Sequence, residues 1–269
     1  MNYSILGKKG CEQMRILAIG DLVGETGVRK AKEVIAQIKE KEMIDFIIVN
    51  AENSADGMGI TEKIYRGLLN SGVNVITMGN HTWGKKDIFN FIDDKQLLVP
   101  ANYSKNVPGN RYGIYECKSK KIGVINLIGR VDINVLSENP FTIVDEIINK
   151  IKNNVDIIIV DFHAEATAEK IAMAYYLDGR VNAIFGTHTH VQTADEQILE
   201  NHTAYITDIG MTGPKKSVIG MNLNASIKRF TTSLPERYKV ADGEAMFNAC
   251  IFDINDEDCR TTNITRINL

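Results

Sequence analysis

Five short apolar runs along the chain are each followed at once by side chains that can bind a metal ion. Four of the five histidines lie in these segments, together with four carboxylates and three carboxamides. The segments are Gly20-Asp21, Asn50-Ala-Glu-Asn53, Gly79-Asn-His81, Asp161-Phe-His-Ala-Glu165 and Gly186-Thr-His-Thr-His190. Ligands of α/β sheets bind in the crevice outside the carboxyl ends of the strands, so we expect these segments to converge on one site.

The candidate ligands favour a transition-metal site with two ions. Imidazole nitrogens mixed with carboxylate and amide oxygens, without a nearby cysteine, favour iron, manganese or zinc over calcium or magnesium. Seven side chains exceed the needs of one tetrahedral zinc and suit two ions that share the Glu52 carboxylate and a water. The seven candidates are Asp21, Glu52, Asn53, Asn80, His163, His188 and His190.

Each residue taken alone also has a structural interpretation. Asp21 and Asn53 could cap helices or turns at strand-to-helix junctions, and a lone His163 could be a hydrogen-bonded core residue. His188 and His190 favour a shared cluster, because residues i and i+2 of extended backbone point the same way. Chance rarely places the same chemistry at every strand end, so the metal interpretation is preferred for the set. His202 has no such neighbours and is expected to lie in a solvated loop.

A dinuclear site would supply the positive charge that the chain as a whole lacks. The net charge is -3 and the pI is near 6.0, which gives no general attraction to nucleic acid or anionic membranes. Two divalent ions against Asp21 and Glu52 leave a charge of about +2, which suits a phosphate ester. Such paired ions activate a bridging hydroxide for attack on phosphorus. His81 adjoins Asn80 and is the candidate general acid for the leaving oxygen.

The elements that must position these side chains alternate between strands and helices. Apolar runs of strand length begin near residues 15, 46, 74, 122, 156, 181, 204 and 249. Helical spacing of apolar residues occurs over 28–38, 64–69 and 143–151, which predicts an α/β fold with layered sheets. We expect a single domain over 14–269, an N-terminal extension over 1–13, and a long loop or flap over about 210–240.

The rest of the composition excludes other classes of protein. The four cysteines, at positions 11, 117, 250 and 259, form no CxxC pair, so neither a zinc knuckle nor a disulfide framework is expected. No segment has the apolar length of a signal peptide or the roughly 20 residues of a membrane span. These features predict a cytoplasmic protein without a membrane partner.

The strand-end segments resemble those of the calcineurin-like metallophosphoesterases, and most closely the YmdB-like bacterial branch, the 2′,3′-cyclic nucleotide phosphodiesterases. The resemblance runs from Met14 almost to the end of the chain and includes Gly20-Asp21-Leu-Val-Gly24 and Gly210-Met-Thr-Gly213. It implies a four-layer αββα sandwich, two mixed β-sheets packed face to face with helices outside. Val23 stands where the wider superfamily has a histidine ligand, and Glu52 where it has aspartate; both departures belong to the branch.

The resemblance also implies how the ligands are shared. Asp21, Glu52, Asn53 and His190 would bind one ion, while Glu52, Asn80, His163 and His188 would bind the other. His81 takes the place of the proton donor. The branch looks iron-using, so two divalent or mixed-valence ions are expected, with iron first and manganese or zinc as alternatives.

The sequence therefore predicts a dinuclear phosphodiesterase that hydrolyses 2′,3′-cyclic nucleotides or cyclic-phosphate RNA ends. Two alternatives stay open: a phosphomonoesterase that uses the same metal site, and a regulatory or RNA-associated protein with structural metals. The oligomeric state is open as well, and a homo-oligomer is compatible with the sequence. Ala55 to Gly59 and Gly210 to Gly220 with Lys215 and Lys216 could contact substrate or form turns. Asp161 and Glu165 could hold ligand imidazoles or cap the helix expected near residue 166.

Overall fold

A computed structural model of the chain describes residues 13–237 and 239–269. Residues 1–12 of the expected extension lie outside the described residues. Gln13, its last residue, is already the first residue of strand β1, two positions before the start predicted from the apolar run. Within the described part of the chain, no helix combines the length and the apolar composition that crossing a bilayer requires.

The first sheet has six strands and contains both termini of the described fold. β1 pairs in parallel with β3 and antiparallel with β14, so the last part of the chain returns beside the first. The order is β15-β14-β1-β3-β4-β5, which makes the sheet mixed. Its strands are β1 (Gln13–Ile19), β3 (Phe46–Asn50), β4 (Val75–Thr77), β5 (Leu97–Leu98), β14 (Asn248–Asn255) and β15 (Thr261–Asn268).

The second sheet also has six strands, in the order β10-β11-β9-β8-β7-β6. Its central strands β7, β8 and β9 are parallel, and the edge pairs β6 with β7 and β10 with β11 are antiparallel. Its strands are β6 (Tyr112–Cys117), β7 (Lys120–Ile128), β8 (Ile157–His163), β9 (Ala183–Thr187), β10 (Gln197–Ile198) and β11 (Ala204–Ile206). A small third sheet joins β2 (Asp21–Leu22), β12 (Met211–Pro214) and β13 (Ala245–Met246).

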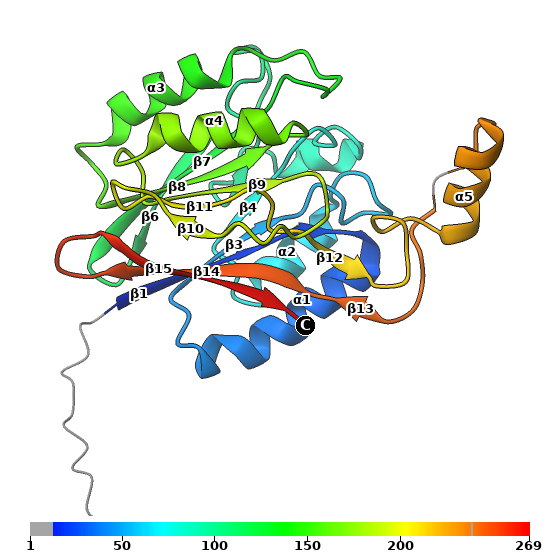
Figure 1. Cartoon of the computed structure of the whole chain (residues 1–269), viewed down its shortest axis with the longest axis horizontal. Coiled ribbons are helices and arrows are strands. Elements are labelled where there is room, and N and C mark those ends of the chain that lie inside the picture. The colour runs from blue at the N-terminus through cyan, green and yellow to red at the C-terminus, as the bar shows by residue number, and fades with distance from the viewer. Residues whose placement is uncertain (1–12, 238) are drawn as a thin grey trace, which may run out of the picture.

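Helices cover the outer faces of the two large sheets (Figure 1). α1 begins with an acidic residue in its first turn and ends with lysines in its last, as the helix dipole favours. Asn139 caps α3, which has proline at its start. The helices are α1 (Gly24–Lys41), α2 (Glu62–Leu69), α3 (Pro140–Ile151), α4 (Thr167–Leu177) and α5 (Leu223–Thr232), with one 3-10 turn, η1 (Lys86–Asn90).

Three groups of buried side chains separate four layers, and the αββα prediction is confirmed. Neighbouring residues on one strand belong to different groups of buried side chains. Leu17 packs toward α1 and α2, whereas Ile16 packs between the sheets. In the second sheet Ile159 faces the same inter-sheet core, whereas Ile158 packs toward α3 and α4. Because the central strands are buried on both faces, their sequences read as continuous apolar runs rather than as alternating patterns.

The segment predicted as a long loop over 210–240 contains regular structure instead. β12 occupies its start, and α5 follows, with the Asn222 side chain accepting a hydrogen bond from the backbone N–H of Ala225. Among the residues of α5 only Ser226 is buried. The helix therefore has no broad apolar face, and the spacing of its apolar residues does not predict it. Figure 1 shows α5 standing clear of the sheets.

Candidate metal centre

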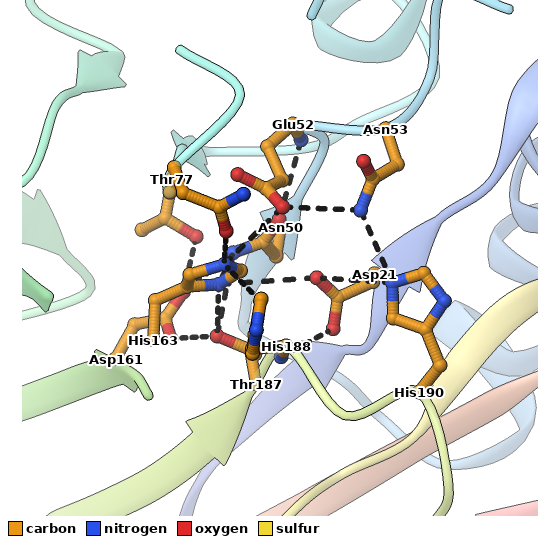
Figure 2. A network of polar contacts seen from close by, with 12 residues as sticks. Asp21, Asn50, Glu52, Asn53, Thr77, Asp161, His163, Thr187, His188 and His190 are labelled. Atoms are coloured by element: carbon orange, nitrogen blue, oxygen red, sulfur yellow. Dashed lines mark hydrogen bonds and ion pairs between the residues drawn. The ribbon is translucent and has the colours of Figure 1, made fainter. Parts of the chain in front are cut away.

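The carboxyl ends of five strands bring all seven predicted ligands to one edge of the sandwich. Asp21 begins β2, which directly follows β1, and Glu52 with Asn53 follows β3. Asn80 follows β4, His163 ends β8, and His188 with His190 follows β9. Figure 2 shows six of the seven, all except Asn80, labelled as they lie around a common centre. The predicted convergence of these segments is therefore confirmed.

Glu52 lies in the middle of the cluster. Its carboxylate is fully buried, and Oε1 lies 3.2 Å from His163 Nε2 and accepts a hydrogen bond of 3.1 Å from Asn53 Nδ2. Its other oxygen accepts a hydrogen bond of 2.8 Å from the backbone N–H of His81. Glu52 thus touches both halves of the candidate site and the candidate proton donor.

One half of the cluster centres on Nε2 of His163. This nitrogen lies 2.9 Å from Asn80 Oδ1 and 3.1 Å from His188 Nδ1. One ligand atom from each of Glu52, His163 and His188 lies within 4.8 Å of the other two, close enough to share an ion. Gly79 leaves room for this arrangement, since a Cβ there would lie 2.4 Å from His163 Nε2 and 2.5 Å from Glu52 Oε2.

The other half centres on Nε2 of His190. This nitrogen lies 3.1 Å from Asn53 Nδ2 and 4.0 Å from Asp21 Oδ1. Asp21 Oδ1 is buried and has no hydrogen-bond partner, an arrangement that is costly for a carboxylate oxygen unless a cation satisfies it. The unpartnered oxygen and the donor set of this half therefore fit a bound metal ion.

Hydrogen bonds to the far nitrogens orient two imidazoles toward the cluster. Nδ1 of His190 lies 2.9 Å from the carbonyl oxygen of Ile219, to which it can only donate, and this leaves the Nε2 lone pair facing Asp21. Nδ1 of His163 lies 2.9 Å from Thr187 Oγ1, which in turn donates a hydrogen bond of 2.8 Å to Asp161 Oδ1. This relay leaves Nε2 of His163 for the cluster.

The buried charges shift one another's pKa values in opposite directions. Burial would raise the pKa of Glu52, but His163 and His81 outweigh it and hold that pKa well below its usual range. Burial lowers the pKa of His163, yet the carboxylates of Glu52 and Asp21 raise it to about 9. Burial and the neighbouring His163 lower the pKa of His188 to about 3, so His188 is neutral at physiological pH.

The two histidines of the last segment do not lie on extended backbone, and that part of the sequence argument was wrong. β9 ends at Thr187, and both histidines have positive φ, 100° for His188 and 67° for His190. Such values are uncommon for residues with a Cβ and persist where surrounding contacts impose them. The turn sends the two rings to different halves of the cluster.

The candidate proton donor lies at the rim of the cluster. His81 Nδ1 is 2.6 Å from Asn53 Oδ1 and 3.4 Å from Glu52 Oε1. About a third of its side chain is exposed, 34%, whereas Glu52 is inaccessible. The imidazole is therefore within reach of a substrate that enters from solvent.

His163 is fully buried and hydrogen-bonded, as its structural interpretation expects, but the expected helix caps are not seen. α1 has Val23 at its N-cap position without a side-chain cap, so neither Asp21 nor Asn53 caps it. α4 likewise has no side-chain cap, and Glu165 instead places Oε2 3.0 Å from His188 Nε2. His202 is exposed in a loop, as expected.

The two glycine-containing stretches contain turns. Gly57 and Gly59 have positive φ, and the N–H of Ala55 donates a hydrogen bond of 2.9 Å to the carbonyl of Gly59. Lys215 lies 3.4 Å from Glu244 on an exposed surface. The tight turn over 55–59 is what positions Asn53, because the N–H of Gly57 donates to its carbonyl.

Sequence reasoning missed several supporting residues. Asn50 and Thr77 both donate hydrogen bonds to the buried carboxylate of Asp161, behind His163. Lys170 and Asp208 form a buried ion pair of 2.7 Å on the other side of the histidine turn. A lysine within a helix and an aspartate after a short strand carry no sequence signal of burial, so only tertiary contacts reveal them.

Comparisons with known proteins place the chain among close relatives. Residues 17–267 match the family described as YmdB-like protein. The chain is 49% identical over 255 residues to the 2′,3′-cyclic-nucleotide 2′-phosphodiesterase of Bacillus subtilis strain 168, covering 94% of this chain and 96% of that protein. The residues matched by the family include all five strand ends of the candidate site.

Two crystal structures have nearly the same fold. A novel phosphatase from Mycoplasma pneumoniae matches with a TM-score of 0.91 at 38% identity, over 96% of this chain and 94% of that one. A hypothetical protein from Thermus thermophilus matches with a TM-score of 0.90 at 34% identity, over 95% of this chain and 99% of that one.

Proposed function

Because the chain belongs to the YmdB-like protein family, we propose that it is a metal-dependent phosphodiesterase that hydrolyses 2′,3′-cyclic nucleotides or cyclic-phosphate RNA ends. Membership confirms the family resemblance predicted from the sequence. The name of the Bacillus subtilis relative supports phosphodiester hydrolysis, and that of the Mycoplasma pneumoniae relative supports phosphoester chemistry. The observation that carries the proposal is the gathering of the seven candidate ligands around the buried Glu52 carboxylate.

The two halves of the cluster would hold one ion each, with Glu52 shared between them. Asp21, Asn53 and His190 complete one half, and Asn80, His163 and His188 complete the other. Two divalent ions held there would supply Lewis acidity toward the phosphoryl oxygens and lower the pKa of a water that attacks phosphorus. Iron is the first candidate and manganese or zinc the alternatives, because the donors are imidazole and oxygen without thiolate.

The chain's own residues would position the substrate and move the proton. Attack of water forms a new P–O bond and breaks the bond to one ribose oxygen, which must gain a proton as it leaves. His81 is partly exposed at the rim and is held by Asn53 and by Glu52, so its imidazole can donate that proton. By analogy with the name of the Bacillus subtilis relative, the bond broken is the one to the 2′ oxygen, which leaves a nucleoside 3′-phosphate.

A substrate panel tests the proposed reaction. Protein purified without oxygen and analysed for metal content should hydrolyse 2′,3′-cyclic nucleotides faster than linear diesters or monoesters of the same nucleoside. Strong hydrolysis of monoesters with none of cyclic diesters would refute the choice and establish the phosphomonoesterase. We place the enzyme in the cytoplasm, where nucleotides and RNA ends are available.

A further inference from the structure

The turn that carries His188 and His190 is held from behind by a buried ion pair, and its role in metal binding rests on the proposed metal site. We propose that Asp208, fixed by Lys170, is a positioning residue that locks this turn through Thr189. Asp208 follows β11 and is fully buried, and its carboxylate bonds Lys170, Thr189 and the N–H of Gly210 instead of a candidate ligand. It therefore acts through the backbone between the two histidines.

The carboxylate of Asp208 is saturated by contacts that converge on the turn. Oδ2 accepts hydrogen bonds from Thr189 N at 3.1 Å, from Thr189 Oγ1 at 2.7 Å, and from Lys170 Nζ at 2.7 Å. Oδ1 accepts from the N–H of Gly210 at 2.8 Å. Lys170 is only 1% exposed, so the pair is screened little by solvent.

The segment after Asp208, residues 209–211, is hydrogen-bonded to both ends of the turn. The N–H of Ile209 donates to the carbonyl of Gly186 at 2.9 Å, and that of Met211 donates to His190 O at 3.1 Å. A Cβ on Gly186 would lie 1.8 Å from the carbonyl oxygen of Thr207, so glycine is needed for the two backbones to approach this closely. Thr189 stands between two residues of positive φ, and its tether offsets the strain of that backbone.

Replacing Thr189 with valine tests the tether with little risk to folding, because this side chain is only partly buried. Loss of an outer hydrogen-bond partner of metal ligands typically weakens metal binding about 10- to 100-fold. We expect this loss of Mn²⁺ affinity in T189V by calorimetric titration of metal-free protein, and recovery in T189S, which keeps the hydroxyl. Thr262→Val is the matched control, since the hydroxyl of Thr262 donates to the carbonyl of Asp253 at the opposite end of the sheet from the turn.

Two results would overturn the inference. The first is a T189V variant that binds Mn²⁺ with an affinity within about twofold of wild type. Such a change is far smaller than the roughly 10- to 100-fold loss expected above, and it would show that the tether does not position the histidines. Wild-type protein that takes up no Mn²⁺ would refute the proposed metal site and the tether's role together. The first result leaves the proposed function intact.

A separate observation points to a subsite for the nucleobase, which likewise rests on the proposed function. The indole of Trp83 is 37% exposed and stacks on the 55% exposed ring of Phe89, with centroids 5.7 Å apart and planes at 13°. Trp83 is two residues after His81, so their Cα atoms are at most about 7.6 Å apart. An exposed aromatic stack this close in the chain to the candidate proton donor is suited to bind the nucleobase of a nucleotide whose phosphate reacts.

The turn that carries Trp83 is fixed to the candidate site. The N–H of Gly84 donates to His81 O at 2.9 Å, and Thr82 Oγ1 donates to the carbonyl of Gly79 at 2.6 Å. The buried Tyr103 packs against Trp83 and donates its hydroxyl to the same carbonyl at 2.9 Å. From these contacts we infer that the Trp83 face stacks on the nucleobase, which is a sequence-tolerant interaction because every base has a π-face.

Trp83 is the only tryptophan of the chain, so its fluorescence reports the subsite directly. Metal-loaded His81→Ala protein, used to slow turnover, should show saturable quenching with 2′,3′-cyclic AMP and none with glycerol 1,2-cyclic phosphate, which lacks a base. In the otherwise wild-type enzyme, W83L should raise KM for the nucleotide about tenfold and leave kcat unchanged. W83F keeps an aromatic face and should bring KM most of the way back to the wild-type value.

Absence of quenching by the nucleotide would overturn the base subsite, whether or not the wild-type protein hydrolyses that compound. An unchanged KM in W83L would overturn it as well. Saturable quenching in His81→Ala together with no hydrolysis by the wild-type protein would support the subsite while refuting the proposed reaction, so the two failures can be told apart.

Discussion

At the scale of single residues, His81 separates a catalytic site from a structural one. It contacts Asn53 and Glu52 but is itself partly exposed, so its removal leaves the seven candidate ligands in place. We predict that His81→Ala lowers turnover of 2′,3′-cyclic nucleotides by about 10² to 10⁴, the usual contribution of a proton donor. Elemental analysis of His81→Ala should find the same metal content per chain as in the wild-type protein. Unchanged turnover would remove His81 from the mechanism and favour a regulatory protein with structural metals.

His163 makes a second prediction at this scale, on the pH dependence of metal uptake. Its pKa is raised to about 9 in the metal-free protein, so at pH 7.5 the ring carries a proton that an incoming ion must displace. Mn²⁺ binding should therefore release about one proton per chain from this ring at pH 7.5, and less as the pH rises through 9. Calorimetric titrations in buffers of different ionisation enthalpy measure the release. His202→Ala should release the same number, and wild-type uptake at pH 7.5 without proton release would contradict the assignment.

At the scale of elements, the strand ends must approach closely for the cluster to form. Gly79 after β4 shows this most sharply, since a Cβ there would collide with His163 and Glu52. We predict that Gly79→Ala weakens Mn²⁺ binding by more than about tenfold, as loss of ligand orientation does elsewhere. Gly67→Ala in α2 is the matched control, because its Cβ meets only the flexible end of Lys32. Equal Mn²⁺ affinity in the two variants would contradict the proposed packing.

The elements also show how far the sequence could be read. Strands buried on both faces, such as β3 and β8, were recognisable because apolar runs end at once in polar ligands. β15 was missed because it lies at an edge and many of its residues are exposed and polar. The histidine turn was misjudged because its backbone N–H groups bond residues distant in sequence, His188 to Asp21 and Thr189 to Asp208. Local patterns therefore identified the side chains that gather at the strand ends but not the contacts that orient them.

At the scale of the whole molecule, the chain closes on itself. β14 pairs with β1 along its length, and the core between the sheets contains side chains from the beginning, middle and end of the fold. We propose that residues 14–269 form one cooperative domain. Calorimetry of the metal-free protein should give one transition with equal calorimetric and van't Hoff enthalpies. Mn²⁺ at 100 times its Kd should stabilise the fold by about 2.7 kcal/mol for each site that it fills. Two separate transitions would contradict a single domain.

The proposed phosphodiesterase activity depends on two metal ions bound at the strand-end cluster. The most direct test is a titration of metal-free protein with Fe²⁺ or Mn²⁺ under anaerobic conditions, following the rate of 2′,3′-cyclic AMP hydrolysis against bound metal per chain. We predict no hydrolysis without metal and full activity at two ions per chain, with a nucleoside monophosphate as product. Full activity in the metal-free protein, or two bound ions with no hydrolysis of the cyclic diester, would contradict the claim.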